Sequence, residues 1–307
     1  MFATPWRLVP ASGRFRRRGA ALLSIALLCG GCADLELCPP RTWTAGFLSQ
    51  GDCLLTRADA FGGHEWLTDL ANRELRDADG RPSFVESEIK TVIEGNRRVD
   101  FPKSLLIHLS NSVVAYADAL SKYHDLPEHQ ARHFLLDDRN SSPEAAAESH
   151  AHMQDLSQEA VELWEQDRVR ALTLIGQACH TLQDSYSPAH ARRDMDDSGR
   201  CVVKLKAYLK RAPGFLSDDI EFHGGTEEDT VGHITPLDSI YREGRDCRNP
   251  DGRAAVKGCL STHAELAIEA TSAYLEAMLD LLRSDAPPEM VEERIEAYLD
   301  RYMSLCE

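Results

Sequence analysis

The chain has 307 residues, 43% of them hydrophobic, which is enough to bury one substantial core in one or two domains. Its formal net charge is −16 at pH 7. A chain this acidic lacks the positive surface that binds duplex nucleic acid, so we expect no such partner. Most of the acidic residues are expected on solvated helix surfaces, and some of them are expected to bind cations.

The first 31 residues have the pattern of an export signal. Arg14, Arg16, Arg17 and Arg18 precede an apolar run from Ala20 to Leu28 that is too short to span a membrane. Small residues and Cys32 follow. The segment resembles a bacterial lipoprotein signal, which implies cleavage before Cys32 and lipidation of that cysteine; ordinary secretion is the alternative.

We therefore expect an exported protein, held in the cell envelope by a lipid anchor at Cys32. Residues 32–60 contain Pro39 and Pro40 and no sustained periodicity, so they are interpreted as a tether. Removal of residues 1–31 takes away five arginines and no acidic residue, which changes the formal net charge from −16 to −21.

Nine cysteines are typical of an oxidising compartment. Beyond Cys32, seven remain: Cys38, Cys53, Cys179, Cys201, Cys247, Cys259 and Cys306. An odd number leaves one unpaired, and Cys179 is the candidate for a buried free thiol. We expect Cys38 to pair with Cys53, and Cys201 with Cys247 or Cys259. No Cys-x-x-Cys spacing occurs, so a thiolate zinc site is not expected.

From residue 61 to 307 the apolar residues have helical spacing nearly throughout. Ser142 and Pro143 are typical of a helix start. Residues 212–252 are rich in Gly, Asp and Pro and are interpreted as an irregular excursion. The pattern predicts helices over 66–75, 105–120, 143–165, 168–179, 202–209, 254–282 and 288–304. No alternating strand pattern is present, so we predict one all-α bundle.

The stretch from Gly176 to His190 carries the strongest chemical signal. His180 and Asp184 are four residues apart and share one helix face. Pro188 ends that helix, so the chain turns and His190 can return toward the same face. Two imidazoles and a carboxylate converging in this way suit Zn²⁺. The alternative is an exposed pair on a helix surface that contributes a few tenths of a kcal/mol, roughly.

The string from His180 through Asp184 and Pro188 to His190 resembles the signature of the zinc-dependent phospholipase C family, which shares its fold with fungal single-strand-specific nucleases. The resemblance implies a multi-helix bundle of that type over residues 61–307. It also implies two or three zinc ions and hydrolysis of a phosphodiester.

Three earlier segments match the family's other ligands in order. His64 lies in Gly63–Thr68, which resembles the segment with the family's early histidine; local hydrogen bonding is the alternative. Asp100 lies in an expected turn over 95–102, where an aspartate is more often a turn former. His133, in Arg132–Asp138, precedes His180 by 47 residues, close to the family's interval.

The last ligand pair has two candidates. His233 and Asp238 resemble the family's Gly-His followed by an acid, although five residues separate them rather than four and Pro236 lies between them. His223 and Glu227 have the expected interval, but two glycines intervene. We prefer His233 and Asp238.

By resemblance, the ions are assigned as follows. One zinc is held by His133, His180, Asp184 and Asp100. The resemblance assigns His190, His233 and Asp238 to a second ion. It assigns Asp184 and His64 to a third, which in the family also binds the mature N-terminal amine; an anchor at Cys32 would remove that group, and Asp59 could replace it.

The resemblance implies phosphodiester hydrolysis in which zinc lowers the pKa of a bound water and Asp100 orients or deprotonates that water. We expect a monomeric phospholipase C that releases diacylglycerol and a phosphorylated head group from membrane phospholipid. A nuclease or nucleotidase of the same fold is the second hypothesis. The third is a non-catalytic zinc-binding envelope lipoprotein.

Overall fold

A computed structural model describes residues 63–75, 83–105, 119, 122–123, 126–137, 140–195, 201–207, 260–284 and 286–307. The chain divides into the compact units Met1–Trp43 and Thr44–Glu307, and every described residue belongs to the second. The signal segment, Cys32, the tether and the helix expected over 105–120 lie mostly or wholly outside the described residues. No helix in the described part of the chain is long and apolar enough to cross a bilayer.

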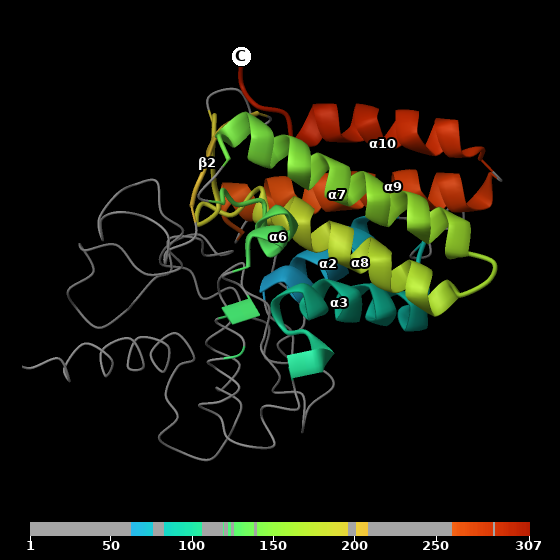
Figure 1. Ribbon diagram of the computed structural model, residues 1–307. Coiled ribbons are helices and arrows are strands. Elements are labelled where there is room, and N and C mark those ends of the chain that lie inside the picture. Colours follow the sequence, from blue (N-terminus) through green and yellow to red (C-terminus); the bar gives the residue numbers. More distant parts are fainter. Residues whose placement is uncertain are drawn as a thin grey trace, which may run out of the picture. The chain divides into compact units, whose positions relative to one another are not determined.

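Helices dominate the described residues, so the all-α prediction is confirmed at that level (Figure 1). Within the described ranges, six longer helices form the body, and three short ones lie between the second and the third of these in the sequence. The longer helices are α2 (Gly63–Glu74), α3 (Glu86–Asp100), α7 (Ser142–Leu163), α8 (Arg168–Asp184), α9 (Thr262–Arg283) and α10 (Pro288–Tyr302). The short helices are η2 (Lys103–Leu105), α6 (Pro127–Gln130) and η3 (Ala131–His133).

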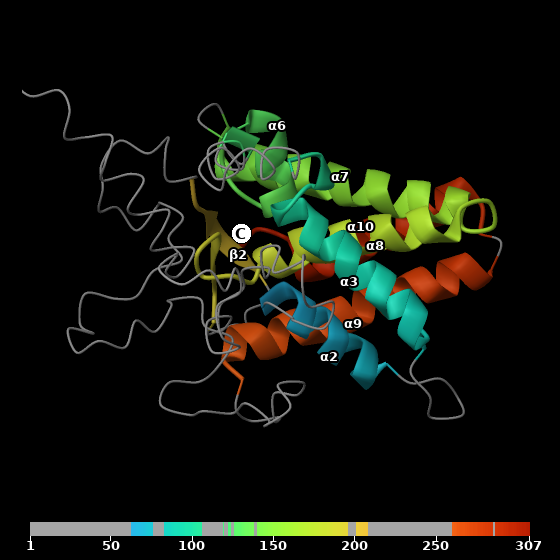
Figure 2. The same ribbon diagram turned by 90° about the horizontal axis from the view of Figure 1, so that it is seen from below.

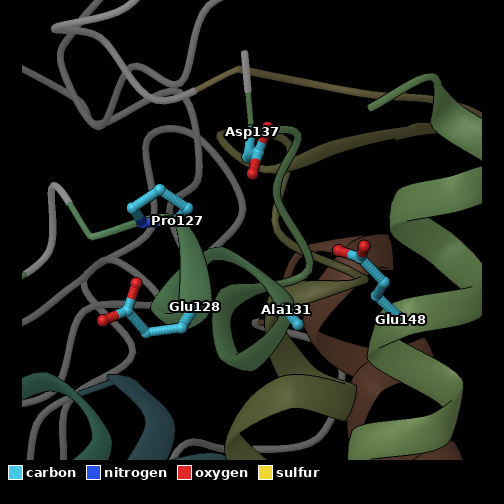
Figure 3. A pocket seen from close by; sticks show the side chains of 5 residues that line it. All are labelled: Pro127, Glu128, Ala131, Asp137 and Glu148. Carbon is cyan, nitrogen blue, oxygen red and sulfur yellow. The ribbon is translucent and has the colours of Figure 1, made fainter. Parts of the chain in front are cut away.

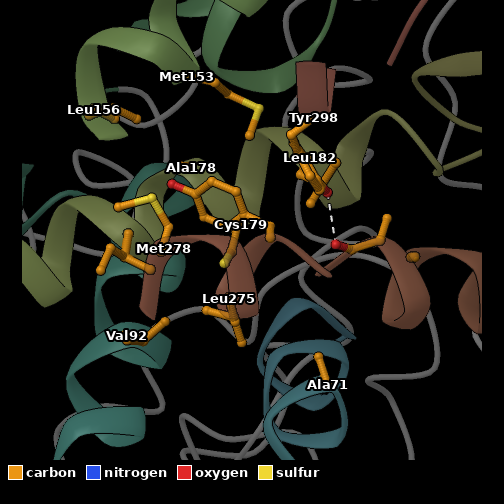
Figure 4. Close-up of a cluster of buried hydrophobic side chains, with 14 of the residues drawn as sticks. Ala71, Val92, Met153, Leu156, Ala178, Cys179, Leu182, Leu275, Met278 and Tyr298 are labelled. Atoms are coloured by element: carbon orange, nitrogen blue, oxygen red, sulfur yellow. Dashed lines mark hydrogen bonds between the residues drawn. The ribbon is translucent and has the colours of Figure 1, made fainter. Parts of the chain in front are cut away.

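Helix α8 lies at the centre and contacts α2, α3, α7 and α9 (Figures 1 and 2). Its apolar residues recur every three or four positions and are fully or nearly fully buried: Leu172, Ile175, Cys179 and Leu182. Figure 4 shows Cys179 and Leu182 of α8 among the side chains of its neighbours, including Val92, Met153, Leu275 and Met278. Cys179 is a buried free thiol, as predicted, and burial raises its pKa.

Capping residues explain where the helices begin. Asp167 accepts a hydrogen bond from the backbone N–H of Arg170 at the start of α8. Helix α7 begins one residue earlier than predicted, because Ser141 rather than Ser142 forms the cap. Glu144, three residues after Ser141, accepts from its backbone N–H and hydroxyl at 2.8 Å, which completes a capping box.

The segment around Asp100 is not the predicted turn but the last part of α3. Gly95 lies not in a turn but where α3 meets α8 backbone to backbone. A Cβ at Gly95 would lie 2.2 Å from the Thr173 carbonyl oxygen, and one at Gly176 would lie 1.9 Å from that of Val92. The two glycines therefore allow a close approach that no other residue permits.

Residues 202–209 do not form the predicted helix. Val202–Leu205 is strand β2, which pairs antiparallel with β1 (Ala191–Arg193) in a two-stranded sheet. Val202 also exchanges backbone hydrogen bonds with the C-terminal tail, donating to Ser304 and accepting from Cys306. Partners distant in the sequence, together with β-branched residues at 202 and 203, outweigh a weak helical pattern.

Cys201 forms a disulfide with Cys306, so the predicted pairing with Cys247 or Cys259 is wrong. The pairing of β2 with the C-terminal tail brings the two cysteines together, with Cα atoms 4.9 Å apart. Sequence spacing contains no trace of this proximity, because 105 residues separate them. Cys38, Cys53, Cys247 and Cys259 lie outside the described residues.

Candidate metal centre

Six of the eight predicted ligands converge on one buried cluster. They come from α2, α3, η3, α8 and the turn that precedes β1: His64, Asp100, His133, His180, Asp184 and His190. Counted over the whole residue, none of them is more than 8% exposed to solvent. His233 and Asp238, and the alternative pair His223 and Glu227, lie outside the described residues.

Three ligand atoms form an almost equilateral triangle. His133 Nδ1 lies 3.2 Å from His180 Nε2 and 3.1 Å from Asp184 Oδ2, and the last two atoms are 3.1 Å apart. Asp100 Oδ1 lies 3.4 Å from His180 Nε2 and 3.8 Å from His133 Nδ1. These buried imidazole and carboxylate groups could hold one metal ion between them.

The second oxygen of Asp184 faces another histidine. Asp184 Oδ1 lies 3.1 Å from His64 Nε2, whereas Oδ2 belongs to the triangle. The imidazole rings of His64 and His180 lie close together, with centroids 4.1 Å apart and ring planes tilted by 34°. The Asp184 carboxylate therefore contacts His64 through one oxygen and His133 and His180 through the other, so it could hold more than one metal ion.

His190 returns to the cluster as the sequence predicts. The helix ends at Asp184, and the backbone N–H of His190 then donates to the carbonyl of Ser187 across the turn that contains Pro188. His190 Nδ1 lies 2.6 Å from the His133 carbonyl oxygen, which can only accept. Nδ1 therefore carries the proton, and Nε2 is the nitrogen that could bind a metal.

Asp184 and Asp100 are ionised although they are buried, because positively charged histidines lie beside them. Burial alone would raise the pKa of Asp184, but the charges of His190, His180 and His64 bring it well below its usual value. The same balance, dominated among the charges by His180 and His133, lowers the pKa of Asp100. Burial disfavours the charged form of His180, yet Asp100 and Asp184 raise its pKa overall. Two ionised carboxylates in one buried site favour a cation.

Helix η3 positions His133 through a strained residue. Phe134, which follows it, has φ 51° and is fully buried, and among the described residues no other non-glycine has positive φ. A bulky side chain adopts this conformation only where its surroundings enforce it. The Thr181 hydroxyl donates to the carbonyl of Arg132 at 2.7 Å and ties η3 to α8. Phe134 also belongs to the hydrophobic core.

Tyr186, two residues after Asp184, is buried. The Arg193 guanidinium lies 3.6 Å from its ring centroid. Arg193 also donates to the carbonyls of Ser185 and Tyr302, each at 2.8 Å. It thereby joins the end of α8 to the end of α10, a role that sequence reasoning missed.

Two further residues were missed because amides carry no ligand pattern. Asn96 Oδ1 lies 3.2 Å from His180 Nδ1, and Gln183 Oε1 lies 2.9 Å from His64 Nδ1. Both amides are fully buried. The only feature of the sequence that could have indicated a role for Gln183 is that it immediately precedes Asp184.

A cleft of about 390 Å³ lies beside η3 (Figure 3). It is lined by Pro127, Glu128, Ala131, Asp137 and Glu148, so three carboxylates face it. Ala131 belongs to the same short helix as His133. The lining of this cleft is therefore acidic.

No family model, no curated protein and no solved structure matches the chain.

Proposed function

We propose that the chain is a zinc-dependent phosphodiester hydrolase with the multi-helix fold of the phospholipase C type. The triangle of His133 Nδ1, His180 Nε2 and Asp184 Oδ2 carries the proposal. Zinc binds nitrogen and oxygen at about 2.0–2.1 Å in a tetrahedron, which sets ligand atoms about 3.3 Å apart. The observed sides of 3.1–3.2 Å fit that spacing.

Asp100 would supply a fourth ligand to the same ion. Its Oδ1 lies 3.4 Å from His180 Nε2 and 3.8 Å from His133 Nδ1. The other oxygen of Asp184, with His64 and His190, would serve one or two further ions. The resemblance to the phospholipase C family implies that His233 and Asp238 would complete these further sites.

The two carboxylates have different tasks in this proposal. The Asp184 side chain is only 2% exposed and contacts imidazoles through both oxygens, so it fixes spacing. The Asp100 side chain is 11% exposed, so solvent can reach it. Its lowered pKa keeps it ionised, so it can accept a hydrogen bond from the attacking water and orient it.

Zinc bound in such a site acts as a Lewis acid, lowering the pKa of a coordinated water from about 16 toward 7 and neutralising charge on the phosphoryl oxygens. The chain contributes the ionised carboxylates, the fixed imidazoles and a site largely closed to solvent. Phospholipid is the favoured substrate, because the acidic cleft beside η3 repels a polynucleotide, which carries a charge at every phosphate. A lipid anchor at Cys32 would hold the enzyme at its substrate in the cell envelope.

The test combines metal content with two substrates. We expect purified protein to contain at least one zinc per chain by plasma emission. It should hydrolyse phosphatidylcholine to diacylglycerol, lose this activity on chelation with dipicolinate, and regain it with zinc. Zinc-dependent cleavage of single-stranded DNA instead would favour the nuclease. Full zinc content with neither activity would favour a binding lipoprotein, and protein that binds no zinc would overturn the proposal.

A further inference from the structure

Two buried amides and two buried hydroxyls form a hydrogen-bond network behind the imidazoles of His64 and His180. Asn96 Nδ2 donates to Thr68 Oγ1 and to Gln183 Oε1, each at 3.1 Å. Gln183 Nε2 donates to Thr68 Oγ1 at 2.9 Å and to Thr271 Oγ1 at 3.3 Å. All four side chains are buried, and every amide proton has an acceptor.

Thr68 decides which way both amides point. Its only hydroxyl proton is donated to the backbone carbonyl of His64 at 2.9 Å, so its oxygen can only accept from other groups. The groups that face Thr68 must therefore be the NH₂ ends of Asn96 and Gln183. The carbonyl ends are consequently turned toward the imidazoles.

The orientation of the amides fixes the proton on each ring. Gln183 Oε1 accepts from His64 Nδ1 at 2.9 Å, and Asn96 Oδ1 accepts from His180 Nδ1 at 3.2 Å. In the neutral ring only one nitrogen carries the proton, so Nε2 keeps its lone pair in both histidines. These Nε2 atoms are the ones that lie 3.1 Å from the Asp184 oxygens.

We propose that Thr68, Asn96 and Gln183 are positioning residues that set the Nδ1–H tautomer of His64 and His180 before any metal arrives. The inference rests on the proposed metal-binding function and adds to it the residues that prepare its nitrogen ligands. Hydrogen bonding to the outer nitrogen of a ligating histidine fixes the ring and raises its basicity, and loss of such a partner typically weakens metal binding about 10–100-fold.

The chain offers a matched pair of substitutions to test this role. Thr68→Val and Thr271→Val remove the same hydroxyl from two buried residues that both accept from Gln183 Nε2, but only Thr68 orients both amides. We expect Thr68→Val to raise the zinc dissociation constant by about 10–100-fold, measured by competition with a chelator. Thr271→Val should stay within about twofold of the wild type, because the imidazole partners are untouched.

A second readout is independent of zinc. Protein labelled with ¹⁵N-histidine, metal-free and at a pH where its histidines are neutral, shows each tautomer in two-bond ¹⁵N–¹H correlation spectra. We expect Nδ1–H for His64 and His180 in the wild type and in Thr271→Val, and a mixture in Thr68→Val. Gln183→Glu keeps the acceptor and should keep the His64 tautomer, whereas Gln183→Met should lose it. Substitution of His64 and of His180 by Gln assigns the signals.

The two readouts separate the two proposals. Nδ1–H signals in a wild type that binds no zinc would refute the proposed function and leave the positioning network intact. Tight zinc binding with Nε2–H signals, or Thr68→Val and Thr271→Val behaving alike in both measurements, would overturn the positioning role.

Discussion

Two regions hold the cluster in place by different means. On one side, α3 and α8 meet through Gly95 and Gly176 with their backbones in contact, and this crossing carries Asp100, His180 and Asp184. On the other side, the β1–β2 hairpin follows directly after His190 and is tied to the C-terminal tail. That tie consists of the disulfide between Cys201 and Cys306, two backbone hydrogen bonds and the buried Arg193.

The difference follows from what each region can bury. The helix crossing has extensive apolar packing and needs no covalent link. The hairpin has short strands, and a two-stranded sheet is at best marginally stable by itself. A cross-link that closes a long loop compensates for the missing core. Ligands on the crossing should therefore depend on packing, and His190 on the covalent and polar tie.

The largest effect on zinc binding and activity is expected at Asp184, on the α8 side of the helix crossing. Asp184→Asn should abolish hydrolysis and most zinc binding, because the amide removes the charge that both groups of imidazoles face. Asp100→Asn should lose activity but keep most of the zinc, because three ligands of the triangle remain. Zinc content by plasma emission and turnover of phosphatidylcholine measure the two effects.

Asp155→Asn, an exposed carboxylate on α7, is the control and should change neither quantity. If Asp184→Asn retained full zinc and full activity, the assignment of the site would be wrong.

The next effect concerns the disulfide. Replacing Cys201 and Cys306 together by Ser should lower the free energy of unfolding by about 4 kcal/mol, because the bond closes a loop of about 100 residues. Urea denaturation of the variant and the wild type gives the difference. Zinc held by the triangle should survive in native conditions, whereas zinc bound through His190 should become easier to remove with a chelator. If zinc were lost equally from the triangle and from the ion bound through His190, the helix crossing and the hairpin would not be held in place independently.

The crossing is tested by adding a single methyl group. Alanine is favoured over glycine inside a helix by about 1 kcal/mol, so propensity alone predicts that Gly176→Ala stabilises α8. A Cβ 1.9 Å from the Val92 carbonyl oxygen reverses that sign, and we expect a net loss of about 3 kcal/mol in urea denaturation. Gln177→Ala, the next residue on α8, should stay within about 0.5 kcal/mol. A stabilised Gly176→Ala protein would contradict the close approach.

The crossing also shows how far sequence reasoning reached. Apolar spacing and capping residues located α7, α8 and α10 to within a few residues, because local periodicity determines them. The motif from His180 to His190 indicated which side chains would meet. The predicted turn at Gly95 was wrong, because a glycine that allows two helix backbones to touch has the same local sequence pattern as a glycine in a turn.

The hairpin region was predicted less well for a physical reason. Strand β2 exists because Val202 pairs with Arg193 and also with the C-terminal tail, and the tail is about 100 residues away in sequence. The disulfide follows from the same pairing. Asn96 and Gln183 were missed for another reason, since an amide acts here through the histidine it contacts and leaves no spacing pattern.

The smallest effect is expected at Arg193, which distinguishes the polar part of the tie from the covalent part. Arg193→Lys keeps the charge but loses the stacking on Tyr186 and the paired donation to Ser185 and Tyr302. We expect a loss of about 2 kcal/mol in the free energy of unfolding, which is less than for the disulfide. Arg192→Lys changes the exposed neighbour in the same way and should stay within about 0.5 kcal/mol. If both variants matched the wild type, the disulfide and the backbone bonds alone would hold the hairpin, and His190 would owe its position to them.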